Sequence, residues 1–275
     1  MHRFVVSAFV IFGLSFVVNA QAKGTATADL IEEWMSGSHR DAGNAARNQY
    51  RHPKGTLTFF GLDASMTVVE IWPSAGWYTE ILAPVLRDKG KYYAAGFALT
   101  AKRTPDWRKK MQREFQKKLD ARPRLYDRLI VTELSIPERT EMAPAGAADR
   151  VLTFRNVHNW MKGDYAPAMF EAMFKALKPG GVLGVVEHRA PKGASRDQMV
   201  VSGYVTEARV KMLASGAGFR FVASSEINAN PKDTADRPSG VWTLPPSLRL
   251  GEKDRAKYLA IGESDRMTLR FVKPF

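Results

Sequence analysis

The feature of this sequence that most constrains the fold is a regular alternation of short, β-branched apolar runs with longer amphipathic segments. Strand-like runs fall at residues 66–71, 91–97, 128–132, 149–154, 182–187, 219–222 and 267–272. Helical periodicity marks residues 77–86, 102–118, 167–177 and 205–214. This alternation predicts an α/β fold with a Rossmann-like, doubly wound sheet of about seven mostly parallel strands. No convincing crossover helix separates the last two runs, which leaves an antiparallel last strand open.

The first 22 residues have the pattern of a secretory signal peptide. Arg3 precedes an apolar run over residues 4–18, and Ala20 and Ala22 supply the small residues of a cleavage site. A buried helix or a membrane anchor is the alternative, but the run is short for a bilayer span. We therefore expect an exported protein, either periplasmic or secreted. The chain has no cysteine, so disulfides and thiolate catalysis are excluded.

The remaining 253 residues, 23–275, are enough for one large α/β domain. Short helical patterns with polar breaks predict an N-terminal helical extension or lid over residues 23–60. The α/β domain then covers residues 61–275. Within it, residues 228–265 form a long segment rich in proline and charge, which is typical of a functional insertion.

Much of the net charge of +13 lies in one predicted helix, residues 102–118, where eight lysines and arginines face two acids. Trp107, Met111, Phe115 and Leu119 recur every fourth residue, so one apolar stripe should face the core. The basic face is expected to be solvated, with weak contact to anionic membrane lipid as the alternative. Nucleic acid is not expected as a partner, because no base-stacking aromatics interleave with the charges and the protein is expected to be exported.

Three motifs occur in a fixed order: VVEIWPSAG at residues 68–76, AADRVLTFRNVH at 147–158 and LKPGGVLGVVE at 177–187. They resemble the cofactor turn, the fourth strand and the fifth strand of class I S-adenosylmethionine (SAM)-dependent methyltransferases. The resemblance extends to three further segments: Arg-His-Pro at 51–53, EIWPSAGWYT at 70–79 and GVWTLPP at 240–246. The chain thus resembles a family of exported bacterial proteins described as predicted methyltransferases. The resemblance implies a methyltransferase fold, SAM as cofactor and a small-molecule substrate.

The resemblance also implies the residues that bind the cofactor. They are Glu70, Trp72, Pro73, Ser74, Gly76, Phe97, Asn156 and Val157. A glycine-rich turn lets the backbone approach the cofactor and offers N–H groups at a helix start. Here only Gly76 of the usual three glycines remains, and Trp72 either fills the pocket or walls one side of it. Residues 94–97 (AAGF) stand where the family has an acid for the ribose hydroxyls.

The candidate catalytic residues are His158, Glu187 and His188, which follow the fourth and fifth strands. Ligands bind outside the carboxyl edge of such sheets. His158 is either a general base or a histidine that orders its loop. Two histidines and a carboxylate can also ligate a metal, but spacing alone does not show convergence, so no metal is assigned.

Aromatic and polar residues at strand ends and in the N-terminal extension are the candidates for substrate contact. They are Tyr50, Arg51, His52, Trp77, Tyr78, Asn159, Trp160 and Tyr204. Two functions remain open. The first is an exported SAM-dependent methyltransferase, and the second is a non-catalytic ligand-binding protein on the same scaffold. A hydrolase is a third and weaker possibility, because the sequence has no Gly-x-Ser-x-Gly elbow.

Overall fold

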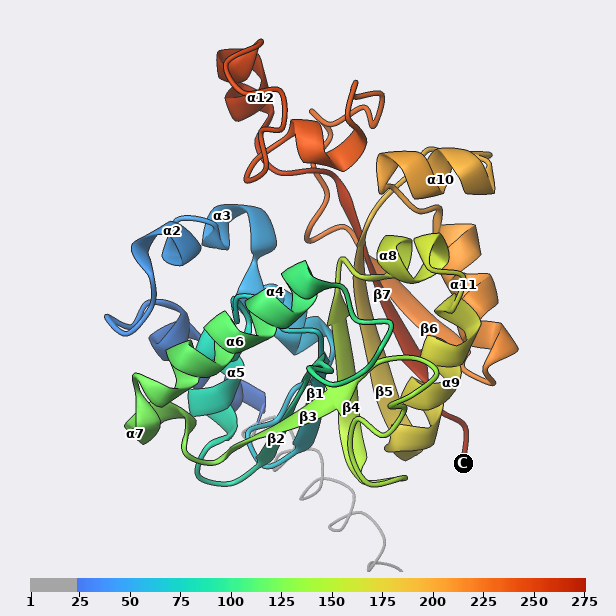
Figure 1. Ribbon diagram of the computed structural model, residues 1–275. Helices are drawn as coiled ribbons and strands as arrows, with labels where there is room; N and C mark the ends of the chain where they lie inside the picture. The colour runs from blue at the N-terminus through green and yellow to red at the C-terminus, as the bar shows by residue number, and fades with distance from the viewer. Residues whose placement is uncertain (1–23) are drawn as a thin grey trace, which may run out of the picture.

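A computed structural model describes residues 24–275 and shows one mixed sheet in the order β3-β2-β1-β4-β5-β7-β6 (Figure 1). The strands are β1 (Thr67–Ile71), β2 (Lys91–Phe97), β3 (Leu129–Leu134), β4 (Ala148–Phe154), β5 (Leu177–His188), β6 (Arg220–Ser225) and β7 (Arg266–Val272). Strands β1 to β5 pair in parallel, and β7 pairs antiparallel with both β5 and β6. The predicted α/β class, strand order along the chain and antiparallel last strand are confirmed.

Helices cover both faces of this sheet. After a helical segment at residues 24–35 come α2 (Ala42–Ala45), α3 (Asn48–Arg51), α4 (Pro53–Phe59), α5 (Thr79–Leu86), α6 (Asp106–Asp120), α7 (Pro123–Tyr126), α8 (Val157–Lys162), α9 (Ala166–Ala176), α10 (Arg196–Ser202), α11 (Glu207–Gly216), the 3-10 turn Gly240–Thr243 and α12 (Arg255–Ile261). The signal peptide expected at residues 1–22 lies outside the described residues. Within the described part of the chain, no helix is long and apolar enough to cross a membrane.

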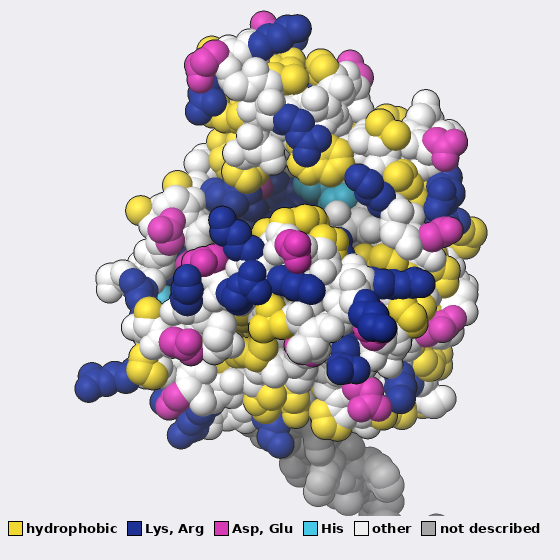
Figure 2. All heavy atoms as spheres, in the orientation of Figure 1, with side chains coloured by type: hydrophobic (Ala, Val, Ile, Leu, Met, Phe, Trp, Pro, Cys, Tyr) yellow, Lys and Arg dark blue, Asp and Glu magenta, His cyan; other side chains and the backbone are white. Residues whose placement is uncertain are grey.

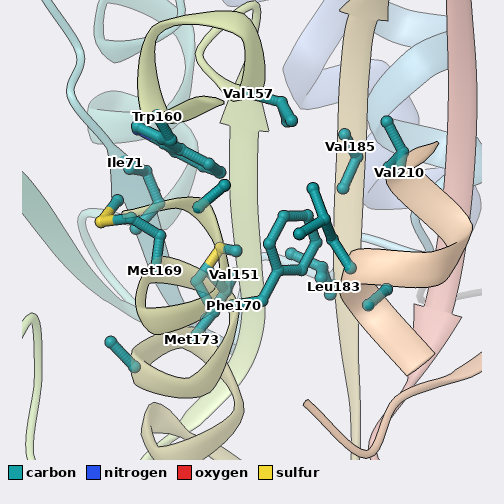
Figure 3. Packing of buried hydrophobic residues seen from close by; sticks show 14 of the residues in the cluster. Ile71, Val151, Val157, Trp160, Met169, Phe170, Met173, Leu183, Val185 and Val210 are labelled. Atoms are coloured by element: carbon teal, nitrogen blue, oxygen red, sulfur yellow. The ribbon is translucent and has the colours of Figure 1, made fainter. Parts of the chain in front are cut away.

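The core follows from the alternation of side chains along each strand. Val68 packs with Leu57 and Phe60 on one face, whereas its neighbour Val69 packs in a second cluster on the other. In that second cluster, α9 lays its apolar stripe against the sheet (Figure 3). The stripe consists of Met169, Phe170 and Met173, which meet Val151, Leu183 and Val185 of β4 and β5. Both faces are therefore buried, as a parallel sheet requires.

Some local features differ from the sequence prediction. Helix α10 was not predicted, although Ser195 and Gln198 form a capping box at its start. Residues 178–181, which lie between the predicted helix and the predicted fifth strand, belong to β5, because Gly180 and Gly181 form backbone hydrogen bonds with Lys273 of the C-terminal segment. Trp107, predicted to face the core, has 56% of its surface exposed. It lies in the first turn of α6, where its ring contacts Phe97 of β2 with one edge.

The basic face of α6 is only partly free. Lys118 pairs with buried Glu80 at 2.5 Å, and the Arg108 guanidinium lies 4.4 Å from the ring centre of Trp72. Two of its cations thus face the protein. Contact of the others with anionic lipid stays a prediction.

The carboxyl ends of β1, β4 and β5 lie below a group of short elements that includes α2, α3, α8, α10 and the lobe with α12 (Figure 1). Two segments far apart in the chain, residues 44–51 and 241–266, meet there. Their contact places the N-terminal extension and the long insertion around one site at the carboxyl edge.

Candidate functional site

The turn after β1 keeps the backbone of a glycine turn without its glycines. Trp72 has φ 46° and Ser74 has φ 56°, both in the left-handed region that glycine normally occupies, and Gly76 follows at φ 76°. Such conformations cost on the order of 1–3 kcal/mol each and persist where the surroundings impose them. The surroundings here are specific: the Trp72 N–H donates to Ala95 O at 2.8 Å, and its indole N–H donates to Leu134 O at 3.1 Å.

One cavity, of about 410 Å³, lies beside this turn at the carboxyl ends of β1, β2 and β3. We call it the aromatic cavity, because its wall includes the rings of Trp72, Phe97, Trp107 and Tyr165. Trp72 lies 4.9 Å from Phe97, centre to centre, and forms one side of the cavity. Asn159 also lines it, but no acid is among its lining residues in the described chain. A ribose in this cavity would have no carboxylate to bind its hydroxyls.

Glu70 points away from this cavity into the protein. It is 3% exposed and accepts hydrogen bonds from the hydroxyls of Tyr92 and Thr79. Burial raises the pKa of Glu70 to about 7, against the two hydrogen bonds, which lower it. The carboxylate of Glu70, which was expected to lie beside the cofactor, is therefore buried beneath the turn.

The three candidate catalytic residues converge. His158 Nδ1 lies 3.1 Å from Glu187 Oε1, and the His158 and His188 rings are 5.4 Å apart, centre to centre. Glu187 is fully buried and also accepts from the backbone N–H groups of Val157 at 2.6 Å and His188 at 2.8 Å. With its Nδ1–H donating to Glu187, His158 accepts a hydrogen bond at Nε2 from the side-chain amide of Asn159, 3.0 Å away. A carboxylate that fixes the tautomer of an imidazole in this way is typical of a general base.

His188 is held differently. Its Nδ1 lies 2.5 Å from Ser264 Oγ. Burial lowers the pKa of His188 well below its ordinary value, and the neighbouring His158 and Arg266 add to the effect. His188 therefore stays neutral at physiological pH. Potential ligand atoms of His158, Glu187 and His188 lie within 4.8 Å of one another, so the set has the dimensions of a metal site.

A second cavity, of about 380 Å³, opens on the other side of the turn. We call it the arginine cavity. Its lining includes Arg47, Arg51, Arg155 and Arg266, together with His158, His188, Glu263, Pro73, Ser74, Trp77 and Trp242. Figure 2 shows a hollow beneath the upper lobe, where dark blue cationic side chains and a cyan histidine gather. The turn and α8 separate the two cavities, since Trp72 and Asn159 line the first while Ser74 and His158 line the second.

The structure brings some of the predicted site residues together and leaves others apart. Tyr50, exposed His52, buried Tyr78 and buried Trp160 line neither cavity. Tyr204 lines a third cavity, and its hydroxyl donates to Asp233 at 2.8 Å. Asn156 and Val157 are buried, the former donating its amide to Ile71 O at 3.0 Å. Neither residue lines the aromatic cavity or the arginine cavity on the other side of the turn.

Sequence reasoning missed most of the arginine cavity. Arg47, Arg155, Glu263 and Arg266 were not among the predicted site residues, although Arg155 ends the fourth-strand motif at a left-handed φ of 61°. The only signal was that a charged residue follows a buried strand. Nothing in the sequence indicates that four arginines from distant segments meet.

Comparison with solved structures agrees with this architecture. A SAM-dependent methyltransferase from Aquifex aeolicus superposes with a TM-score of 0.54 at 18% identity, over 83% of this chain and 93% of the other. This protein has the class I methyltransferase fold. Human N-acetylserotonin methyltransferase in complex with SAM shares that fold at a TM-score of 0.50 and 14% identity, covering 98% of this chain and 61% of its own.

The methyltransferase fold does not by itself determine the activity. The [4+2]-cyclase SpnF also superposes, with a TM-score of 0.54 at 16% identity over 87% of this chain and 85% of the other. No family model and no curated protein sequence matches this chain. Its function must therefore be argued from its own site.

Proposed function

We propose that this protein is an exported SAM-dependent methyltransferase that acts on a small molecule. The observation that carries the proposal is His158, held by buried Glu187 at the carboxyl edge, beside a turn that keeps the left-handed glycine backbone. The fold, shared with SAM-dependent methyltransferases, supports it. A base of this kind, between two cavities of ligand size, suits transfer between a bound donor and a bound acceptor.

The aromatic cavity is the proposed place of the cofactor. Phe97 and Trp107 offer flat surfaces for a purine, which would share them with the Arg108 guanidinium that lies over the rings of Trp72, Phe97 and Trp107. The turn and Asn159 would flank the methionine part. When bound, SAM supplies an electrophilic methyl group. The cavity fits SAM in size and aromatic character, but its lining also includes Arg103, Arg108 and Lys162 and, within the described chain, lacks the acid that usually binds the ribose.

The proposed role of His158 is to accept the proton of the acceptor's hydroxyl at Nε2, where that hydroxyl replaces the Asn159 amide as hydrogen-bond donor. Its Nδ1–H stays bonded to Glu187, which stabilises the imidazolium that forms. The acceptor lies in the arginine cavity, on the side of α8 that His158 lines. His188, kept neutral, orders that wall through its contact with Ser264.

A ligand-binding protein without catalysis is the second candidate. It is favoured by Trp72, whose buried side chain walls the aromatic cavity where the fold usually has glycine, and by the missing acid. On this scaffold the two cavities would hold a ligand, and His158 would only order the α8 loop.

Calorimetry with SAM separates the two candidates. We expect binding with a dissociation constant below about 1 mM, or more than about 4 kcal/mol. His158→Ala should leave SAM affinity within about threefold, because His158 faces the acceptor, and should lower turnover by about 10²–10⁴-fold once an acceptor is supplied. A lack of heat and of any rise in melting temperature at several millimolar SAM would reject the methyltransferase. A large loss of melting temperature in His158→Ala with unchanged turnover per folded molecule would make His158 structural.

A further inference from the structure

The arginine cavity carries more positive charge than its own residues neutralise. Arg47, Arg51 and Arg266 all pair with one carboxylate, Glu263, at 2.5 Å, at 3.4 Å and in a third, very short contact. Burial alone would raise the pKa of Glu263, but Arg266, Arg51 and Arg47 outweigh it and lower the pKa to about 2. Glu263 is thus charged at every physiological pH. Its one negative charge is shared among three guanidiniums.

Arg155 is the fourth guanidinium of the cavity and makes no side-chain hydrogen bond or ion pair among residues 24–275. Burial and, next, the nearby charge of Arg266 lower the pKa of Arg155 to about 10. Its backbone is left-handed, so this side chain is held at the carboxyl end of β4 at some cost. The Arg155 side chain is partly accessible from the cavity, whereas the Nε of Arg266 is buried and has no hydrogen-bond partner. Buried, unpaired guanidinium N–H groups are costly unless a ligand satisfies them.

Four arginines and one glutamate leave three net positive charges around about 380 Å³. Desolvated guanidiniums bind oxyanions through paired N–H groups, so they suit phosphate or carboxylate. SAM cannot balance this excess, because its sulfonium and ammonium outnumber its single carboxylate. A dianion is the smallest group that neutralises most of the charge.

We propose that the arginine cavity binds a small molecule through a doubly charged oxyanion group, such as a phosphate monoester, with Arg155 as the principal unpaired contact. The statement that this molecule is the methyl acceptor rests on the proposed function, whereas the anion site does not. The site also predicts cooperativity: a bound dianion removes the repulsion that SAM's net positive charge meets, so each ligand strengthens binding of the other.

The test uses inorganic phosphate at pH 8 as the dianion and acetate as the monoanion, with calorimetry and thermal melting at constant ionic strength. We expect phosphate to bind at least tenfold more tightly than acetate. Arg155→Gln should weaken phosphate binding at least tenfold, and without anion it should raise the melting temperature by on the order of 3 °C, because it removes a partly buried charge that has no ion-pair partner among residues 24–275. Arg124→Gln, the same change at an exposed arginine of α7, is the control and should alter neither.

Three outcomes would overturn the proposal: equal affinity for acetate, equal loss of phosphate binding in Arg155→Gln and Arg124→Gln, or displacement of phosphate by SAM with equal loss of SAM binding in Arg155→Gln. The last would assign the cavity to the carboxylate of the cofactor. The test is separable from that of the methyltransferase. Phosphate binding without SAM binding keeps the anion site and rejects the activity, and the reverse rejects only the anion site.

Discussion

Replacement of Glu70 by glutamine should make the protein more stable at neutral and alkaline pH. Glu70 is 3% exposed, its partners are the hydroxyls of Tyr92 and Thr79, and its pKa is raised by burial to about 7. Glutamine has the size of a protonated glutamate and can keep a carbonyl oxygen toward both hydroxyls. The substitution therefore removes the titration and little else.

The sign and the pH window follow from the raised pKa. An acid whose pKa is 4.5 when unfolded and about 7 when folded favours the folded state while it is protonated. Its stabilising contribution is complete below pH 4.5 and is lost as the pH rises through 7. At 1.36 kcal/mol for each pH unit between these two values, the loss is about 3 kcal/mol. We expect Glu70→Gln and the parent protein to differ by less than about 1 kcal/mol near pH 4.5, and the variant to be more stable by about 3 kcal/mol at pH 8.

Urea denaturation at pH 4.5, 6, 7 and 8, followed by tryptophan fluorescence, measures this difference. The control is Glu114→Gln, the same change on the exposed face of α6, where 58% of the glutamate side chain is exposed. Curves of unfolding free energy against pH that run parallel for the parent and Glu70→Gln would refute the reasoning. They would show that burial does not disfavour the charged form of Glu70.

Two further predictions concern the turn and the N-terminus. Gly76→Ala should lower the free energy of unfolding by at least about 1 kcal/mol, because φ is 76° and an added Cβ would lie 3.0 Å from the Phe115 ring of α6. Thermal melting measures this loss, and an unchanged melting temperature would contradict the prediction. The clash is with the core rather than with a ligand, so a bulky residue at this position tests folding before it tests cofactor affinity. Export predicts that N-terminal sequencing of protein from the native cell envelope begins near Gln21 or Lys23, and a chain that starts at Met1 in the cytoplasm would reject it.

Much of the architecture was predictable because it depends on the local periodicity of apolar side chains. The β-branched run 66–71, the helical stripe of residues 167–177 and the fifth-strand motif each specify an element through its own side-chain spacing. Placement of His158, Glu187 and His188 at one edge also followed, since parallel strands end at the same side of a sheet. The antiparallel β7 was anticipated only from the lack of a crossover helix.

What the sequence by itself determined is the order of elements, the turn after β1 and the edge at which ligands would bind, because these depend on neighbouring residues and on rules of chain connection. Only the tertiary structure decided that Glu70 turns inward to Tyr92 and that Trp72 walls a cavity. It alone brought Arg47, Arg155 and Arg266 around Glu263. The Arg47–Glu263 pair spans 216 residues of chain. Charges that far apart leave no periodic trace in the sequence, since their meeting depends on how the N-terminal extension and the long insertion fold over the same edge of the sheet.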